Sequence, residues 1–137
     1  MQAVLDSFLA GFPVLMLHSS VTIAMLVAGV LVYVWITPWD EVKLIRAGNT
    51  AAAVSMGGAV IGLAIPLAFA MAASVSVYEI LVWGPVTLVL QIIAYRIADV
   101  VLKDLPQRIE DGEMGAAVLL VSIKLAAAAI NAAAVAG

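Results

Sequence analysis

The sequence predicts an all-α membrane protein with four transmembrane helices, built as two parallel repeated helical hairpins. The first observation is composition: 66% of the 137 residues are hydrophobic and 11% are charged, whereas a soluble domain carries about 25% charged residues. The mean hydropathy is +1.20. The second observation is a set of four long apolar runs, and the third is a partial match between the two halves. The whole chain, 1–137, is expected to be a single integral membrane domain that binds the lipid bilayer.

The four apolar runs extend over about residues 14–36, 50–73, 78–102 and 114–136. Each run reaches the roughly 20 residues that a helix needs to cross a bilayer. The runs lack the period-2 polarity of a transmembrane barrel strand, so helices are favoured. The start of the third helix is open, because it begins either near Tyr78 or at Pro85.

Basic residues predict the orientation of the chain. They gather between the first and second helices and between the third and fourth: Lys43, Arg46, Lys103 and Arg108. The N-terminus, the second loop and the C-terminus carry neither lysine nor arginine. By the positive-inside rule, both basic loops face the cytoplasm and both termini are extracytoplasmic.

The two halves resemble each other, with repeat one at about 14–73 and repeat two at about 78–136. Aligning them places Tyr33 opposite Tyr95 and Gly48 opposite Gly112. Both halves enter the membrane from the same side, so the pseudo-symmetry axis is expected along the membrane normal.

The turns carry recognisable start and stop residues. In the first turn we expect Thr37 to cap a short helix with Pro38 at its first position, and Gly48 to end it. Asn49 is then expected to cap the second long helix at Thr50. The second turn repeats this punctuation with Pro106 and Gly112, and Asp111 is the expected cap of the fourth long helix.

Lys124 is the most unusual residue, because it lies near the middle of the fourth apolar run. A central lysine costs about 3 kcal/mol on insertion scales and usually faces a helix bundle or a wet cavity. Every acidic residue is expected near a membrane face, so Gln91 is the preferred acceptor if the third helix begins near Tyr78. Three roles stay open: a packed lysine without chemistry, an anion or proton site, and a partner for another protein's carboxylate.

Small residues form two predicted packing faces. Gly58 and Gly62 form a small-xxx-small pair in the second long helix. The fourth long helix carries Ala126, Ala129 and Ala133 at helical spacing, with Asn131 nearby. These faces serve packing within one chain or between copies, and in a homo-oligomer Asn131 is expected to hydrogen-bond across the interface.

The residues predict no enzyme, because no nucleophile–base set, phosphate-binding glycine loop or metal cluster is recognised. We therefore assign no catalytic, cofactor-binding or metal residues. The absence of cysteine excludes thiolate metal sites. No basic patch indicates a nucleic acid partner.

The stretch TPWDEVKLIRAGNTAAAVSMGGAVIGLAIPLA, the later WGPVTLVLQ and the closing INAAA resemble the YjfL-like bacterial inner-membrane proteins. This is a family with a domain of unknown function in which a two-helix unit commonly occurs twice. The resemblance covers nearly the whole chain after the first helix, and it implies a multi-pass inner-membrane protein associated with envelope stress. The second repeat departs from the pattern, with Glu113-Met114 where the first has Asn49-Thr50, and Lys124 belongs to no motif of the family.

Two functions follow as hypotheses. The leading one is a homo-oligomeric or partner-binding membrane scaffold linked to envelope stress, whose partner is a membrane or cytoplasmic protein. The alternative is an oligomeric channel or transporter in which Lys124 lines the path of an anion or a proton.

Overall fold

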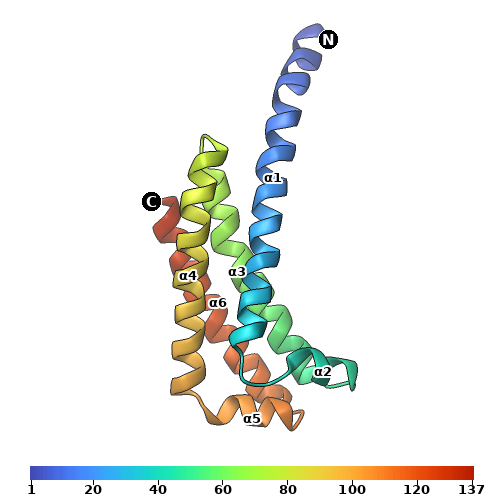
Figure 1. The fold of residues 1–137 in the computed structure, drawn as a ribbon, viewed down its shortest axis with the longest axis vertical. Helices are drawn as coiled ribbons and strands as arrows, with labels where there is room; N and C mark the ends of the chain where they lie inside the picture. Colours follow the sequence, from blue (N-terminus) through green and yellow to red (C-terminus); the bar gives the residue numbers. More distant parts are fainter.

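The computed structural model describes residues 1–137 and confirms the all-helical class with four membrane-length helices. The long helices are α1 (Gln2–Ile36), α3 (Thr50–Ala73), α4 (Val77–Val101) and α6 (Met114–Ala136). Two short helices, α2 (Glu41–Arg46) and α5 (Asp104–Glu110), lie together across one end of the bundle (Figure 1). We call this the basic end, because its turns carry the four cations named above. The C-terminus and the α3–α4 turn lie at the opposite end.

The first helix is longer than predicted, since α1 begins at Gln2 rather than near residue 14. At 1.5 Å per residue its 35 residues extend about 52 Å. Its N-terminal part projects past the rest of the bundle (Figure 1), and every side chain from 1 to 17 is exposed. The apolar sequence continues the helix through Pro13, whose neighbours keep helical geometry.

The two turns at the basic end follow the glycine prediction closely. Gly48 has φ +90° and Gly112 has φ +83°, a left-handed conformation that strains any residue with a Cβ. The Asn49 side chain accepts from Ala52 N and caps α3, as predicted. Its amide also donates to the carbonyls of Ile109 and Glu110, both at 3.0 Å, and so ties the end of α5 to the start of α3.

Two predicted caps are wrong. Thr37 does not cap the short helix, because its hydroxyl donates to Tyr33 O at the end of α1. Asp40 caps α2 instead, so Pro38 lies before this helix rather than at its first position. Asp111 does not cap α6, since the cap position is Glu113. The side chain of Glu113 pairs with Arg108 rather than with the helix. Pro106 is buried inside α5.

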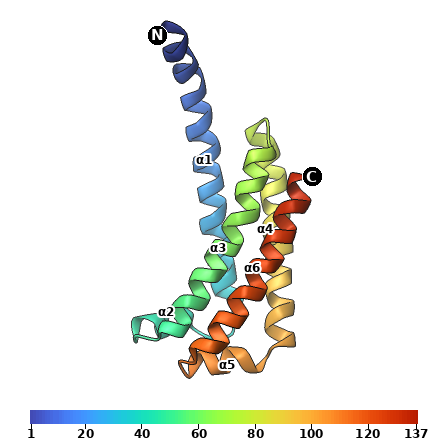
Figure 2. The ribbon, with the colours of Figure 1, turned by 180° about the vertical axis from the view of Figure 1, so that it is seen from behind.

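Close packing of α3 on α6 forms the centre of the bundle (Figure 2). A Cβ on Gly58 would come within 2.5 Å of Val121 on α6, so this glycine permits the approach, as predicted. Gly62 is also buried, but it faces the Tyr95 hydroxyl on α4. The α6 face is shifted from the prediction: Ala128 and Ala132 are buried, whereas the predicted alanines are exposed, namely Ala126, Ala129 and Ala133.

The duplicated hairpin stays a prediction, but two of its residue pairs have similar settings. Tyr33 and Tyr95 are both fully buried and meet edge to face, with ring centroids 5.7 Å apart. Gly48 and Gly112 both end short helices at the basic end. The two tyrosines therefore bring α1 and α4 together where the polar residues gather.

Candidate functional site: a buried charged cluster

Lys124 lies inside the bundle with its side chain 1% exposed. Its Nζ lies 3.2 Å from Asp99 Oδ1 and donates to the Tyr33 hydroxyl at 3.0 Å. The ammonium also lies 5.0 Å from the Tyr33 ring centroid and 4.9 Å from that of Tyr95, within the range of cation–π attraction. The prediction that Gln91 accepts a hydrogen bond from the Lys124 ammonium is wrong. Its Nε2 instead donates to the backbone carbonyl of Lys124, at 3.4 Å.

The direction in which helical side chains lean explains how Asp99 reaches Lys124. Side chains on an α-helix tilt toward its N-terminus. Helix α6 starts at the basic end, so Lys124 leans toward that end, while α4 ends there and Asp99 leans into the bundle. The backbones of Lys124 and Asp99 lie at different depths in the bundle, but their side chains lean toward each other, so the two charged groups come into contact. The expectation that no carboxylate of the chain matches the depth of Lys124 is wrong for this reason.

Glu41 adds a second buried carboxylate to the cluster. It is 1% exposed, although it begins the short helix α2 outside the membrane spans. Its Oε1 accepts from Trp39 Nε1 at 3.3 Å and from the Tyr33 hydroxyl at 3.5 Å, while Oε2 has no hydrogen-bond partner. Tyr33 thus bridges Glu41 and Lys124. Burial raises the pKa of Glu41 above its ordinary value, and the nearby Lys124 charge and the Trp39 bond offset only part of this rise.

The raised pKa of Glu41 predicts a pH-dependent stability. The folded state holds the Glu41 proton more tightly than the unfolded state, so the free energy of unfolding should fall as pH rises above the ordinary glutamate pKa. Glu41→Gln keeps the acceptor for Trp39 and should flatten this part of the profile. Thermal unfolding of both proteins across pH in one detergent measures the difference. Equal slopes for the two proteins would contradict the assignment.

Amide side chains continue the polar cluster toward the opposite end. Asn131 Nδ2 donates to Gln91 Oε1 at 3.2 Å and to Thr87 O at 3.3 Å. Gln91 and Thr87 are buried, and the Thr87 hydroxyl has no hydrogen-bond partner. Asn131 therefore finds partners within its own chain rather than needing the predicted second copy.

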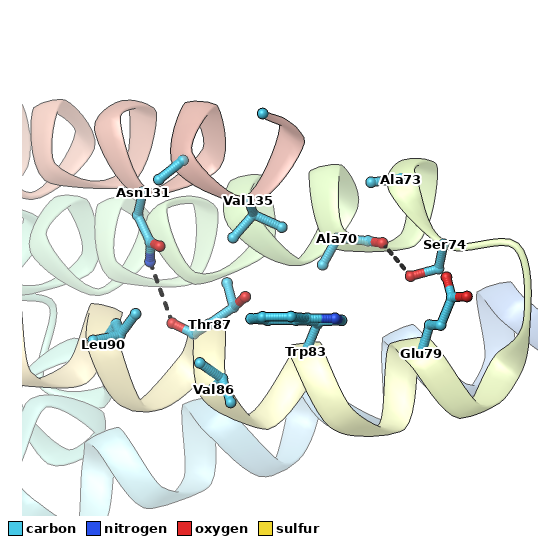
Figure 3. Close-up of a pocket in the computed structure, with 12 residues that line it drawn as sticks. Ala70, Ala73, Ser74, Glu79, Trp83, Val86, Thr87, Leu90, Asn131 and Val135 are labelled. Atoms are coloured by element: carbon cyan, nitrogen blue, oxygen red, sulfur yellow. Dashed lines mark hydrogen bonds between the residues drawn. The ribbon is translucent and has the colours of Figure 1, made fainter.

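Two cavities approach this polar core from the two ends of the bundle. At the basic end, a cavity of about 380 Å³ is bounded by α4, α5 and the segment after α1, and Asp99 lines it. At the opposite end, a cavity of about 470 Å³ is lined by α3, α4 and α6, and Thr87 and Asn131 lie in its wall. Figure 3 shows Trp83, Thr87 and Asn131 around this second cavity. The charged cluster around Lys124 and the amides of Gln91 and Asn131 therefore lie between the two cavities.

The arrangement can hold and move a proton. Glu41, Tyr33, Lys124 and Asp99 form a buried series of titratable groups, and each neighbouring pair lies within 3.5 Å. Asp99 Oδ1 pairs with Lys124, and its Oδ2 lies 3.8 Å from Arg96 Nη1, so the carboxylate joins the buried lysine to a more exposed arginine at the basic end. The remaining predicted residues have structural positions: Gly58 and Gly62 lie at close helix contacts, Asn49 caps α3, and Gly48 and Gly112 follow the ends of the short helices.

The fold and the charged cluster define a polytopic helical membrane protein with an ionic site buried between its spans. A family model described as Domain of Unknown Function (DUF350) matches residues 7–135, so the chain belongs to this family. It is 30% identical over 130 residues to the UPF0719 inner membrane protein YjfL of Escherichia coli strain K12, covering 95% of this chain and 96% of that protein. YjfL of Escherichia coli O157:H7 matches equally. No solved structure matches the chain.

These relatives confirm the YjfL-like resemblance and make the chain a multi-pass inner-membrane protein.

Proposed function

We propose that the protein is a non-enzymatic transporter that binds and releases a proton at the Lys124 cluster. The observation that carries the proposal is the buried ion pair of Lys124 with Asp99 at the inner wall of the basic-end cavity. Ionisable residues inside a membrane are costly, and they commonly mark ion or proton pathways. The second cavity at the opposite end supplies the other opening that transport needs.

Between the two ions considered for Lys124, the geometry favours the proton. Asp99 already balances the charge of the ammonium, and Glu41 lies one tyrosine away. Arg96 also lies 3.8 Å from Asp99 but is 38% exposed, so within the buried part of the cluster Lys124 faces two carboxylates, which weaken the attraction for an anion. The same carboxylates provide acceptors for a proton, so the proton pathway is the proposal we keep.

Proteoliposomes that contain a pH-sensitive dye test this function. An imposed potential should drive acidification in wild-type vesicles, and Lys124→Met or Asp99→Asn should reduce the rate to that of empty vesicles. Lys43→Met is the matched control, because Lys43 is an exposed lysine on α2 outside the cluster. Equal rates for Lys124→Met and wild type, with both proteins folded, would reject the proposal.

The orientation forms part of the same proposal. We place the basic end in the cytoplasm and both termini outside it, which is supported by the basic turns. Reporter domains that are active on only one side of the membrane, fused at each end of the chain, test this directly. Cytoplasmic activity at either terminus would reverse the arrangement.

A homo-oligomeric or partner-binding scaffold is the second candidate, and the envelope-stress role implied by the family resemblance belongs to it. The observation in its favour is that α6 exposes Ala126, Ala129 and Ala133, small residues that permit close approach of another helix. The chain has no cysteine, so a single Ala129→Cys should give a disulfide-linked dimer in membranes. Ala132→Cys is the control, because Ala132 is buried within the chain. A dimer from neither variant, or from both equally, would count against this face.

A further inference from the structure

The cavity at the opposite end is chemically unlike the cavity beside Asp99. Its volume is about 470 Å³, the size of a small-molecule pocket. Trp83 is its one aromatic residue and Glu79 its one charged residue, and lysine and arginine are absent from its wall. Most of the remaining wall is apolar.

Three features of this wall favour a positive charge. The face of a tryptophan attracts cations, and Trp83 is 54% exposed, so its ring is accessible to a ligand. Glu79 adds a carboxylate, of which Oε2 already accepts from Val75 N at 2.9 Å. The C-terminal turn of α3, at Ala70 and Ala73, also lines the cavity, and helix C-termini carry partial negative charge.

Thr87 supplies an independent sign that a ligand belongs here. Its side chain is 0% exposed, and its hydroxyl has no hydrogen-bond partner within the protein. Buried hydroxyls are almost always paired, so an unpaired one in the wall of a cavity indicates a missing polar partner. Figure 3 shows Thr87 directed to the same space as the Trp83 ring, with Asn131 beside it.

We infer that this cavity binds an organic ammonium ion that carries apolar substituents, such as a quaternary ammonium ion with a hydroxyl group. The apolar wall contacts the substituents, Trp83 and Glu79 stabilise the charge, and Thr87 pairs with the polar group of the ligand. The binding site stands on these contacts alone. Its use as a transport site rests on the proposed function.

Calorimetric titration of the purified protein with choline tests the site. Its neutral carbon analogue, 3,3-dimethylbutan-1-ol, has the same shape without the charge and should bind at least about tenfold more weakly. Glu79→Gln keeps an acceptor for Val75 N, and Trp83→Leu keeps apolar bulk. Each should weaken choline binding about tenfold. Trp35→Leu is the control, because Trp35 is an exposed tryptophan like Trp83 but lies outside the cavity.

Thr87→Val separates binding from folding. Because the hydroxyl is unpaired in the free protein, valine should leave thermal stability unchanged or raise it, yet it should weaken choline binding. Equal binding of choline and its neutral analogue, or undiminished binding by Glu79→Gln and Trp83→Leu, would overturn the inference.

Two further measurements identify the source of the ligand and its link to transport. Dihexanoylphosphatidylcholine that displaces choline would assign the site to a lipid headgroup, whereas binding of choline alone would assign it to a soluble amine. Both results support an ammonium site. Lys124→Met should retain choline binding while losing proton flux, so failure of the proton proposal and failure of this inference give different results.

Discussion

Asp99→Leu should destabilise the folded protein by about 3–5 kcal/mol, the cost of leaving one member of a buried ion pair without its partner. Lys124 would keep Tyr33 as its hydrogen-bond acceptor, but it would lose the carboxylate at 3.2 Å. Reversible unfolding in mixed detergent micelles, followed by helix content, measures this loss.

The double variant Asp99→Leu with Lys124→Met should recover most of the lost stability. Replacement of a whole buried ion pair by apolar side chains is often neutral or stabilising. The double variant should nevertheless show no proton flux. A double variant no more stable than Asp99→Leu alone would show that the two residues do not act as a pair. A folded double variant with full flux would remove the cluster from the transport mechanism.

Gly62→Ala should be the most damaging small substitution in the helix core. The added methyl group would occupy the position of the Tyr95 hydroxyl, which donates to Ala59 O at 3.1 Å. Overpacking costs about 1–3 kcal/mol, and loss of a buried hydrogen bond adds about 1 kcal/mol. We therefore expect a destabilisation of about 2–4 kcal/mol in the same micelle unfolding experiment.

Matched variants identify the cause of the Gly62 effect. Gly57→Ala adds the same methyl group to the same helix at an exposed position with open space around it, so it should be neutral or slightly stabilising. Combining Gly62→Ala with Tyr95→Phe removes the clashing oxygen and should restore about half of the lost stability or more. Equal destabilisation by Gly57→Ala and Gly62→Ala would show that helix propensity rather than contact with Tyr95 is responsible.

The sequence predicted the spans well because hydropathy and glycine conformation are local properties. The bounds of α3 and α6 match the prediction, and α4 starts at Val77, close to the earlier of its two expected starts. The left-handed glycines were predictable because a helix stop at the end of an amphipathic turn favours that conformation. The N-terminal extension of α1 was missed because polar residues and Pro13 interrupt the apolar run before residue 14, namely Gln2, Asp6 and Ser7.

The site was only partly predictable. Lys124 stands out against its apolar neighbours, but Asp99, Tyr33 and Glu41 lie near the ends of their helices, where polar residues are ordinary. Side chains on antiparallel helices tilt in opposite directions, and this tilt brings these residues to Lys124. The depth of each backbone position in the membrane does not reveal such a contact. The buried face of α6 was missed for another reason: alanine is so frequent between residues 126 and 136 that spacing does not select one face.

The length of α1 makes the charged cluster sensitive to the thickness of the bilayer. A hydrocarbon layer about 30 Å thick accommodates a longer apolar helix by letting it tilt, and residues 2–17 of α1 are exposed and free of contacts that would hold its angle. Tyr33 lies at the other end of this helix, between Glu41 and Lys124. A change in membrane thickness that alters the inclination of α1 would shift the hydroxyl that joins these two charges.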